Sequence, residues 1–180
     1  DSPDRLLAAP GHGAVVAEYQ KRYQVMSRAQ MDTTLVVPRS WRQAMARPVK
    51  SERLPEAEFK IVDLRAWFPW HGAIFAYGGL SDALENNPCD ILECIEEPFS
   101  LAALQVARWR RRRNPRLPFV VFSSQNLYKR YPWPFSAWER FVLQEADGLI
   151  GVNAEVVEVF KRKGFYGLTT VIPNGIDAHF

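Results

Sequence analysis

Short apolar runs alternate with helix-forming segments along the whole chain, and this alternation constrains the fold more than any other feature. The runs that read as strands span residues 5–9, 33–37, 59–64, 90–95, 119–122, 148–152 and 169–172. Helical patterns fall between them, over residues 15–26, 80–87, 101–113, 137–146 and 154–163. Such an order predicts an α/β fold, a doubly wound parallel sheet with helices on both faces. The imperfect alternation over 59–64 suggests an edge strand.

Capping residues indicate where the later helices begin and end. Asn153 precedes the segment 154–163 and Gly164 follows it, and both residue types are favoured at those positions. Ser136 and Glu139 form the S-x-x-E pattern of a capping box, which predicts the start of the helix over 137–146. The segment 39–55, interrupted by prolines, is predicted to be a loop with a short turn of helix.

Polar residues follow three of the predicted strands at the point where each strand ends. Ligands of open α/β sheets bind outside the carboxyl ends of the strands, so these residues are the predicted site. They are Gly11, His12 and Gly13 after the first strand, Glu96 and Glu97 after 90–95, and Ser123, Ser124, Gln125 and Asn126 after 119–122. Lys129 and Arg130 follow in the next loop.

These groups also have structural interpretations. His12 in a glycine turn is more commonly a loop histidine than a catalyst. Adjacent carboxylates can position hydroxyl groups or act as acid and base, but one of Glu96 and Glu97 can instead cap the helix that begins near Ser100. The aromatic stretch over residues 67–79 either lines a binding site or covers the core.

The glycine turn argues against a nicotinamide site. The dinucleotide fingerprint G-x-G-x-x-G needs a small residue at its last position, where this chain has Val16. The same residue argues against an NAD-dependent sugar epimerase. Glycines still let a backbone approach a ligand closely, and the amides of a helix N-terminus favour an anion.

The net charge of +3 conceals an uneven distribution of charge. Residues 101–140 hold nine basic side chains against one acid, whereas residues 81–97 hold six acids and no base. The run Arg110, Arg111, Arg112 and Arg113 is either a solvated last helical turn or a face that meets phosphate or an anionic membrane. No nucleic-acid-binding motif is present, and we expect no nucleic-acid partner.

Metal, disulfide and membrane-spanning functions are all disfavoured. The three histidines have no metal-ligand spacing, and Cys89 and Cys94 are too close along one strand to form a disulfide. No apolar run approaches the ~18 residues that cross a bilayer, and the first residues lack the basic region of a signal peptide. We expect a cytoplasmic protein, with the arginine run available for peripheral contact at the inner face of the membrane.

Three segments together resemble the N-terminal half of a GT-B-fold glycosyltransferase of family 4. They are NPCDILECIEEPFSLAALQ (87–105), SSQNLYKRYPWPFSAWERFVLQEADGLIGVNAEVVEVFKRKGF (123–165) and VIPNGIDAHF (171–180), which cover about half of the chain in the family's order. The resemblance implies two Rossmann-like domains that face each other across a cleft. Residues 1–172 would form the acceptor-binding domain, and residues 173–180 would begin the crossing to a C-terminal donor-binding domain.

The resemblance also implies a reaction. Retaining enzymes of this family transfer a hexose from a nucleotide-diphosphate sugar to a glycan or lipid-linked acceptor, often in bacterial polysaccharide assembly. The nucleotide sugar is a co-substrate, and no cofactor is expected in this domain. The implied catalytic residues are Gln125 and Glu97. The implied substrate-binding residues are Gly11, His12, Gly13, Glu96, Asn126, Lys129 and Arg130.

The chain departs from the family pattern at three places. Many members carry histidine where this chain has Gln125, and relatives often carry histidine where it has Glu93. The donor domain's E-x7-E motif has no usable counterpart, because Glu85 and Glu93 match its spacing across a turn and a strand. We therefore expect the 180-residue chain to be inactive by itself. The alternative is a non-enzymatic module that binds an anionic membrane surface or a partner.

Overall fold

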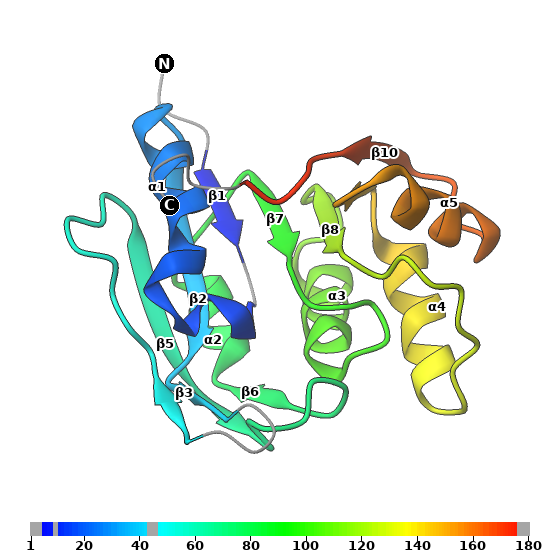
Figure 1. The fold of residues 1–180 in the computed structure, drawn as a ribbon, viewed down its shortest axis with the longest axis horizontal. Helices are drawn as coiled ribbons and strands as arrows, with labels where there is room; N and C mark the ends of the chain where they lie inside the picture. The colour runs from blue at the N-terminus through cyan, green and yellow to red at the C-terminus, as the bar shows by residue number, and fades with distance from the viewer. Residues whose placement is uncertain (1–4, 9–10, 43–46, 176–180) are drawn as a thin grey trace.

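A computed structural model describes residues 5–8, 11–42 and 47–175 (Figure 1). Eight strands form one sheet in the order β10-β9-β8-β7-β1-β2-β5-β6. Every neighbouring pair is parallel except β5 and β6. The predicted α/β fold with a doubly wound parallel sheet is confirmed. Ala9, His179 and the rest of residues 176–180, on which parts of the predictions fall, lie outside the described residues.

The strands of the sheet follow the predicted runs closely, with one addition. They are β1 (Arg5–Ala8), β2 (Asp32–Pro38), β5 (Lys60–Trp67), β6 (Ala76–Gly78), β7 (Ile91–Cys94), β8 (Phe119–Ser123), β9 (Gly148–Gly151) and β10 (Leu168–Val171). The helices are α1 (Lys21–Arg28), α2 (Leu80–Glu85), α3 (Leu101–Arg113), α4 (Phe135–Glu145) and α5 (Ala154–Arg162). The addition is β6, which pairs with β5, so the prediction of β5 as an edge strand was wrong.

The chain reverses its direction of winding at β1. From β1 it moves to β2 and then β5 on one side, and it later returns to β7, on the other side of β1, before continuing to β8, β9 and β10. The carboxyl ends of β1 and β7 therefore flank a topological switch point, where a crevice for a ligand is expected in this class of sheet.

Two apolar clusters hold the layers together. On one face, Tyr23 of α1 packs with Leu35 and Val37 of β2. On the other face, Val36 belongs to a larger cluster with buried residues of α2, α3, α4 and α5. Successive side chains of a strand point to opposite faces, so β2 contributes to both clusters. At the far edge, β10 is exposed at all four of its residues.

Local side-chain caps explain the best-predicted helices. The Ser100 hydroxyl accepts a hydrogen bond from the Ala103 amide at 3.1 Å and begins α3. The Asn153 side chain accepts from the Val156 amide at 3.0 Å and begins α5, which confirms this predicted cap. Gly164, with φ of +89°, follows α5 in the left-handed conformation that glycine adopts readily.

Two local predictions were wrong. The capping box is not formed, because α4 begins at Phe135 after Pro134 without a side-chain cap, and Glu139 pairs with Lys163 instead. The segment 39–55 contains a two-stranded hairpin, β3 (Ser40–Trp41) with β4 (Val49–Lys50), and no turn of helix in its described part.

The first helical segment starts as two 3-10 turns, His12–Val15 and Ala17–Gln20, before α1.

The aromatic stretch over 67–79 covers the core with only part of its side chains. Phe75 and Tyr77 are buried in the larger cluster, whereas Trp67, Phe68 and Trp70 are about half exposed.

Within the described ranges, no helix has the length and apolarity that would let it cross a membrane.

Candidate active site

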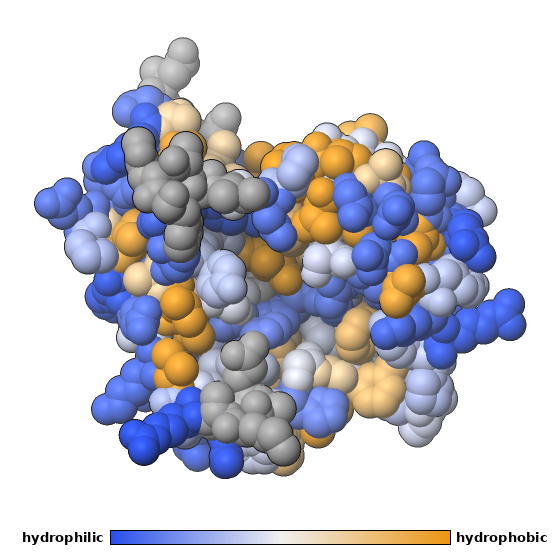
Figure 2. Space-filling model, in the orientation of Figure 1, coloured by the Kyte–Doolittle hydropathy of each residue, from blue (hydrophilic) through white to orange (hydrophobic). Residues whose placement is uncertain are grey.

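A cavity of about 680 Å³ lies at the switch point. Its walls come from the turn after β1, from α1, from the residues after β7 and β8, and from Asn174 and Gly175. In Figure 1 the segment after β10 runs back across the sheet toward α1, which brings these two residues to the cavity. In Figure 2 apolar side chains gather beside α1, over the β7 and β8 part of the sheet.

His12 and Glu96 are paired in the cavity wall. The His12 amide donates to Glu96 Oε1 at 2.6 Å, and His12 Nδ1 lies 2.8 Å from each carboxylate oxygen. The Glu96 side chain is 3% exposed and that of His12 is 37% exposed. The carboxylate thus fixes the ring through Nδ1, and Nε2 is the ring nitrogen left to act on a bound molecule.

Aromatic rings fix the plane of the His12 imidazole. Its centroid lies 4.3 Å from that of Trp41 in the hairpin and 5.6 Å from that of Phe75. Burial lowers the pKa of His12, but the hydrogen bond and charge of Glu96, with the charge of Glu97, outweigh it and raise the pKa above its usual value. A histidine held in this way suits proton transfer or hydrogen bonding to a hydroxyl.

Glu97 is held at the end of β8. Its carboxylate accepts hydrogen bonds from the Ser123 hydroxyl at 2.5 Å and from the Ser124 amide at 3.0 Å. Burial raises the pKa of Glu97 despite these hydrogen bonds. Neither Glu96 nor Glu97 caps α3 with its side chain, because Ser100 does so. Both carboxylates are therefore part of the cavity wall.

Arg22 is a cavity residue that the sequence did not indicate. Its Nη2 donates to Glu93 Oε1 at 2.7 Å, and its guanidinium lies 4.9 Å from the centre of the Phe122 ring. Glu93 is almost fully buried, and its Oε2 has no hydrogen-bond partner. Burial raises the pKa of Glu93 more than Arg22 lowers it. Since 71 residues separate the pair, no local pattern reveals it.

The structure brings some predicted site residues together and leaves others apart. Gly11, His12, Gly13, Glu96, Glu97 and Ser124 all line the cavity. An added Cβ at Gly13 would meet no atom within 4 Å, so the backbone there is open to a ligand.

The remaining predicted residues do not line the cavity; they are Ser123, Gln125, Asn126, Lys129 and Arg130. Gln125 Nε2 donates to the Leu127 carbonyl at 3.2 Å, while its Oε1 is buried without a partner. Asn126, Lys129 and Arg130 are exposed on the loop after β8.

The run of four arginines does not form one surface patch. The Arg110 side chain is only 11% exposed, and it donates to the Leu117 carbonyl and to Asp147, both at 2.9 Å. Arg111 lies 3.5 Å from Glu145, and Arg113 lies 3.4 Å from Glu85. The charge of Arg110 is thus turned inward, and membrane contact by the arginine run stays a prediction.

Metal-ligand geometry is absent from the part of the chain that the structure describes, where no three His, Cys, Asp or Glu side chains are grouped to hold an ion. Cys89 and Cys94 are not joined by a disulfide. At the cavity, the side chains of His12, Glu96 and Glu97 offer hydrogen bonding, charge stabilisation and proton transfer.

The fold recurs in solved glycosyltransferases. Sucrose-phosphate synthase from Thermosynechococcus elongatus is 12% identical, with a TM-score of 0.65 over 97% of this chain and 49% of that chain. Phytolacca americana UGT2, complexed with UDP-2fluoro-glucose and pterostilbene, is 12% identical, with a TM-score of 0.56 over 99% of this chain and 55% of that one. An alpha-glucosyltransferase complexed with UDP-glucose and DNA is 14% identical, with a TM-score of 0.51 over 94% of this chain and 41% of that one.

The chain thus spans about half the length of these solved relatives. No curated protein sequence matches it significantly. A family model, described as the glycosyl transferase 4-like domain, matches residues 7–175, nearly the whole chain. Together with the fold, this match shows that the chain belongs to the glycosyl transferase 4-like family and forms a domain of the GT-B type.

Proposed function

We propose that this chain is the acceptor-binding half of a retaining glycosyltransferase. The complete enzyme would transfer a hexose from a nucleotide-diphosphate sugar to a glycan or lipid-linked acceptor. The observation that carries the proposal is the cavity at the switch point, lined by His12 and Glu96 in a fixed hydrogen-bonded pair. A cleft with oriented hydrogen-bonding groups and an open backbone at Gly13 suits a polyhydroxylated substrate.

In this proposal the protein acts by positioning the substrates and stabilising charge. The acceptor hydroxyl attacks on the face from which the diphosphate departs, without a protein nucleophile. His12 Nε2 would hydrogen-bond the reacting hydroxyl, with Glu96 keeping the ring in place. Glu97 would accept hydrogen bonds from other acceptor hydroxyls. Gly11 and Gly13 would let a substrate approach the backbone.

Gln125, Asn126, Lys129 and Arg130 have a different place in the proposal. These four residues lie outside the cavity, so we propose that they meet the acceptor or donor only across the cleft, where a C-terminal donor domain would stand. That domain would supply the nucleotide-sugar site. The 180-residue chain would accordingly bind acceptor without transferring sugar.

The test compares residues 1–180 with the complete polypeptide encoded by the same gene. Both are assayed for release of nucleoside diphosphate from UDP-glucose, UDP-galactose and GDP-mannose, with a panel of glycan and polyprenyl-phosphate acceptors. We expect transfer by the complete protein and none by residues 1–180. Transfer by residues 1–180 alone would refute the division of the cleft between two domains.

His12 is tested in the complete protein. His12→Ala is expected to lower kcat/KM by about 100-fold, the scale of a lost acid–base or hydroxyl-positioning group. Arg140→Gln, an exposed change on α4, is the control and is expected to leave the rate unchanged. Undiminished transfer by the His12 variant would remove this residue from the mechanism.

A further inference from the structure

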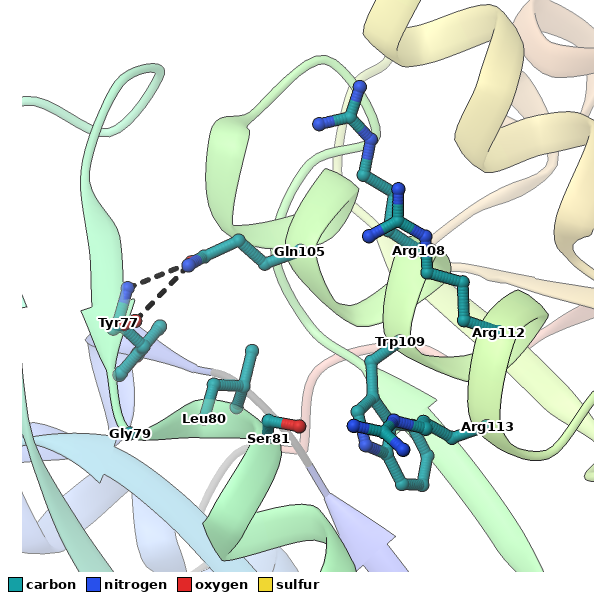
Figure 3. Close-up of a pocket in the computed structure, with 9 residues that line it drawn as sticks. All are labelled: Tyr77, Gly79, Leu80, Ser81, Gln105, Arg108, Trp109, Arg112 and Arg113. Atoms are coloured by element: carbon teal, nitrogen blue, oxygen red, sulfur yellow. Dashed lines mark hydrogen bonds between the residues drawn. The ribbon is translucent and has the colours of Figure 1, made fainter.

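A second hollow, on the opposite side of the sheet from α1, is lined by a concentration of positive charge. It has a volume of about 680 Å³ and lies between the β6–α2 corner and the later turns of α3 (Figure 3). Three of its lining residues are arginines, Arg108, Arg112 and Arg113, and none is an acid. This hollow shares no residue with the cavity at the switch point.

The arginines of α3 fall into two groups, those that form ion pairs and those that do not. Arg110 and Arg111 face Glu145, and Arg113 reaches Glu85 at 3.4 Å. Arg108 and Arg112 form no ion pair with any acid among the described residues. They stand one helical turn apart, and like charges at this spacing destabilise a helix. A bound anion would relieve that repulsion.

The wall opposite the arginines is held in place before any ligand binds. Gln105 of α3 accepts a hydrogen bond from the Tyr77 amide at 2.8 Å and donates one to the Tyr77 carbonyl at 3.1 Å, as the dashed lines in Figure 3 mark. These two bonds join the edge strand β6 to the helix that carries the arginines. A preformed site binds without the cost of ordering its walls.

Trp109 forms the apolar part of the same lining, together with Leu80. Figure 3 draws its indole ring among the residues of the hollow, next to Arg108 and Arg112 in the sequence of lining residues along α3. The ring thus stands where it can report on a molecule that enters the hollow.

We propose that this hollow binds a phosphate group. Guanidinium groups match the geometry of phosphate oxygens and bind them through paired hydrogen bonds, and Arg108 and Arg112 have no acid that competes for them among the described residues. The volume lies in the range of small-molecule sites, about 300–1,000 Å³. The phosphate would come from a soluble phosphorylated molecule or from a lipid headgroup. Either source places a second site on this domain, away from the proposed cleft and independent of it.

The experiment uses sodium pyrophosphate as the soluble probe and vesicles of phosphatidylglycerol as the lipid probe. Pyrophosphate binding is followed by calorimetry and by the Trp109 indole resonance at constant ionic strength, with Trp109→Phe used to assign that resonance. Phosphatidylcholine vesicles provide the neutral comparison. Saturable binding of pyrophosphate identifies a soluble ligand, and binding of phosphatidylglycerol vesicles alone identifies a headgroup.

The variant Arg108→Gln/Arg112→Gln removes the two unpaired charges. A charge-matched control, Arg39→Gln/Arg140→Gln, changes two exposed arginines outside the hollow. The first variant is expected to weaken the observed binding by at least about tenfold, since a hydrogen bond to a charged group contributes that much or more. The control should bind like the wild type. Equal binding by both variants, equal weakening by both, or no binding to either probe overturns the proposal.

Discussion

The carboxylate of Glu96 holds His12 by two different groups. It accepts from the His12 backbone amide at 2.6 Å and from the ring Nδ1 at 2.8 Å, although 84 residues separate the two in sequence. The amide contact fixes the turn after β1, and the ring contact fixes the imidazole. The Glu96 side chain, just after β7, thereby orders both the backbone of the turn and the His12 imidazole at the switch point.

Replacing Glu96 by glutamine should lower the pKa of His12. The amide keeps the hydrogen bond but removes the charge that, with the hydrogen bond itself, raises this pKa against the effect of burial. An NMR titration of the His12 ring protons measures the shift, and His71, exposed on another loop, is the internal control. An unchanged His12 titration would contradict the pairing.

The unfolding free energy of Glu96→Gln, relative to that of the wild type, should depend on pH. Since the folded-state pKa of His12 lies above its unfolded value, the stabilisation is complete below about pH 6.5 and is lost as the pH rises through the folded pKa. Urea unfolding of Glu96→Gln against the wild type should therefore show a deficit that shrinks with increasing pH. A deficit that grows instead would assign the stabilisation to another group.

Arg22→Met should destabilise the fold in a way that increases with pH. The change removes the cation that pairs with the buried Glu93 carboxylate and raises the pKa of Glu93, which burial already raises. When Glu93 is protonated, it carries no charge that needs the Arg22 guanidinium. The variant therefore loses unfolding free energy relative to the wild type only as the pH rises through the native pKa of Glu93. We expect about 2 kcal/mol at pH 8, less than for a fully buried pair, and little at pH 4. Arg22→Met/Glu93→Gln should remove most of the pH dependence, measured by the same unfolding experiment.

Lys163→Met should cost about 3 kcal/mol of unfolding free energy, because it leaves a buried carboxylate unpaired. Lys163 Nζ lies 2.5 Å from Glu139 Oε1, and the two side chains are 6% and 11% exposed. Replacing both residues, as Lys163→Met/Glu139→Leu, should restore stability to near the wild-type value. If the double variant is as unstable as the single one, the apolar stem of Lys163 matters more than its charge.

Arg110→Ala and Arg112→Ala should differ in stability although the residues are two apart. Arg110 donates to the Leu117 carbonyl and to Asp147, and its loss leaves that carbonyl without this donor, at a cost of about 2 kcal/mol. Arg112 is exposed, and its removal should change stability by less than about 0.5 kcal/mol. Thermal unfolding of the two variants compares them directly. Equal losses would mean that Arg110 is solvated like its neighbour.

Local chemistry made much of the fold predictable. The bounds of α3 agree with the sequence pattern because Ser100 caps its start, while Asn114 and Pro115 stop it. The strands were found because their apolar runs end at polar or glycine residues. The hairpin of β3 and β4 and the short strand β6 were missed, since two or three residues carry too little periodicity to be recognised.

The site was predictable only in part. The ends of parallel strands meet at one edge of the sheet, so the positions of His12, Glu96 and Glu97 followed from topology alone. Which side chains pair there depends on packing between distant segments. Ser136 and Glu139 show the limit of local patterns, because the buried cation of Lys163 attracts Glu139 away from the capping box.

The exposed edge at β10 has a practical consequence for work with this chain. No strand among the described residues pairs with the outer side of β10, and such an edge is a template for another strand. Leu168 and Val171 add apolar side chains to that template. No proline or basic residue interrupts it between Leu168 and Ile172. Aggregation of the 180-residue chain should therefore begin at this edge and rise with concentration, so that a lysine at Thr169 or Val171 would do more for its solubility than any improvement of the core.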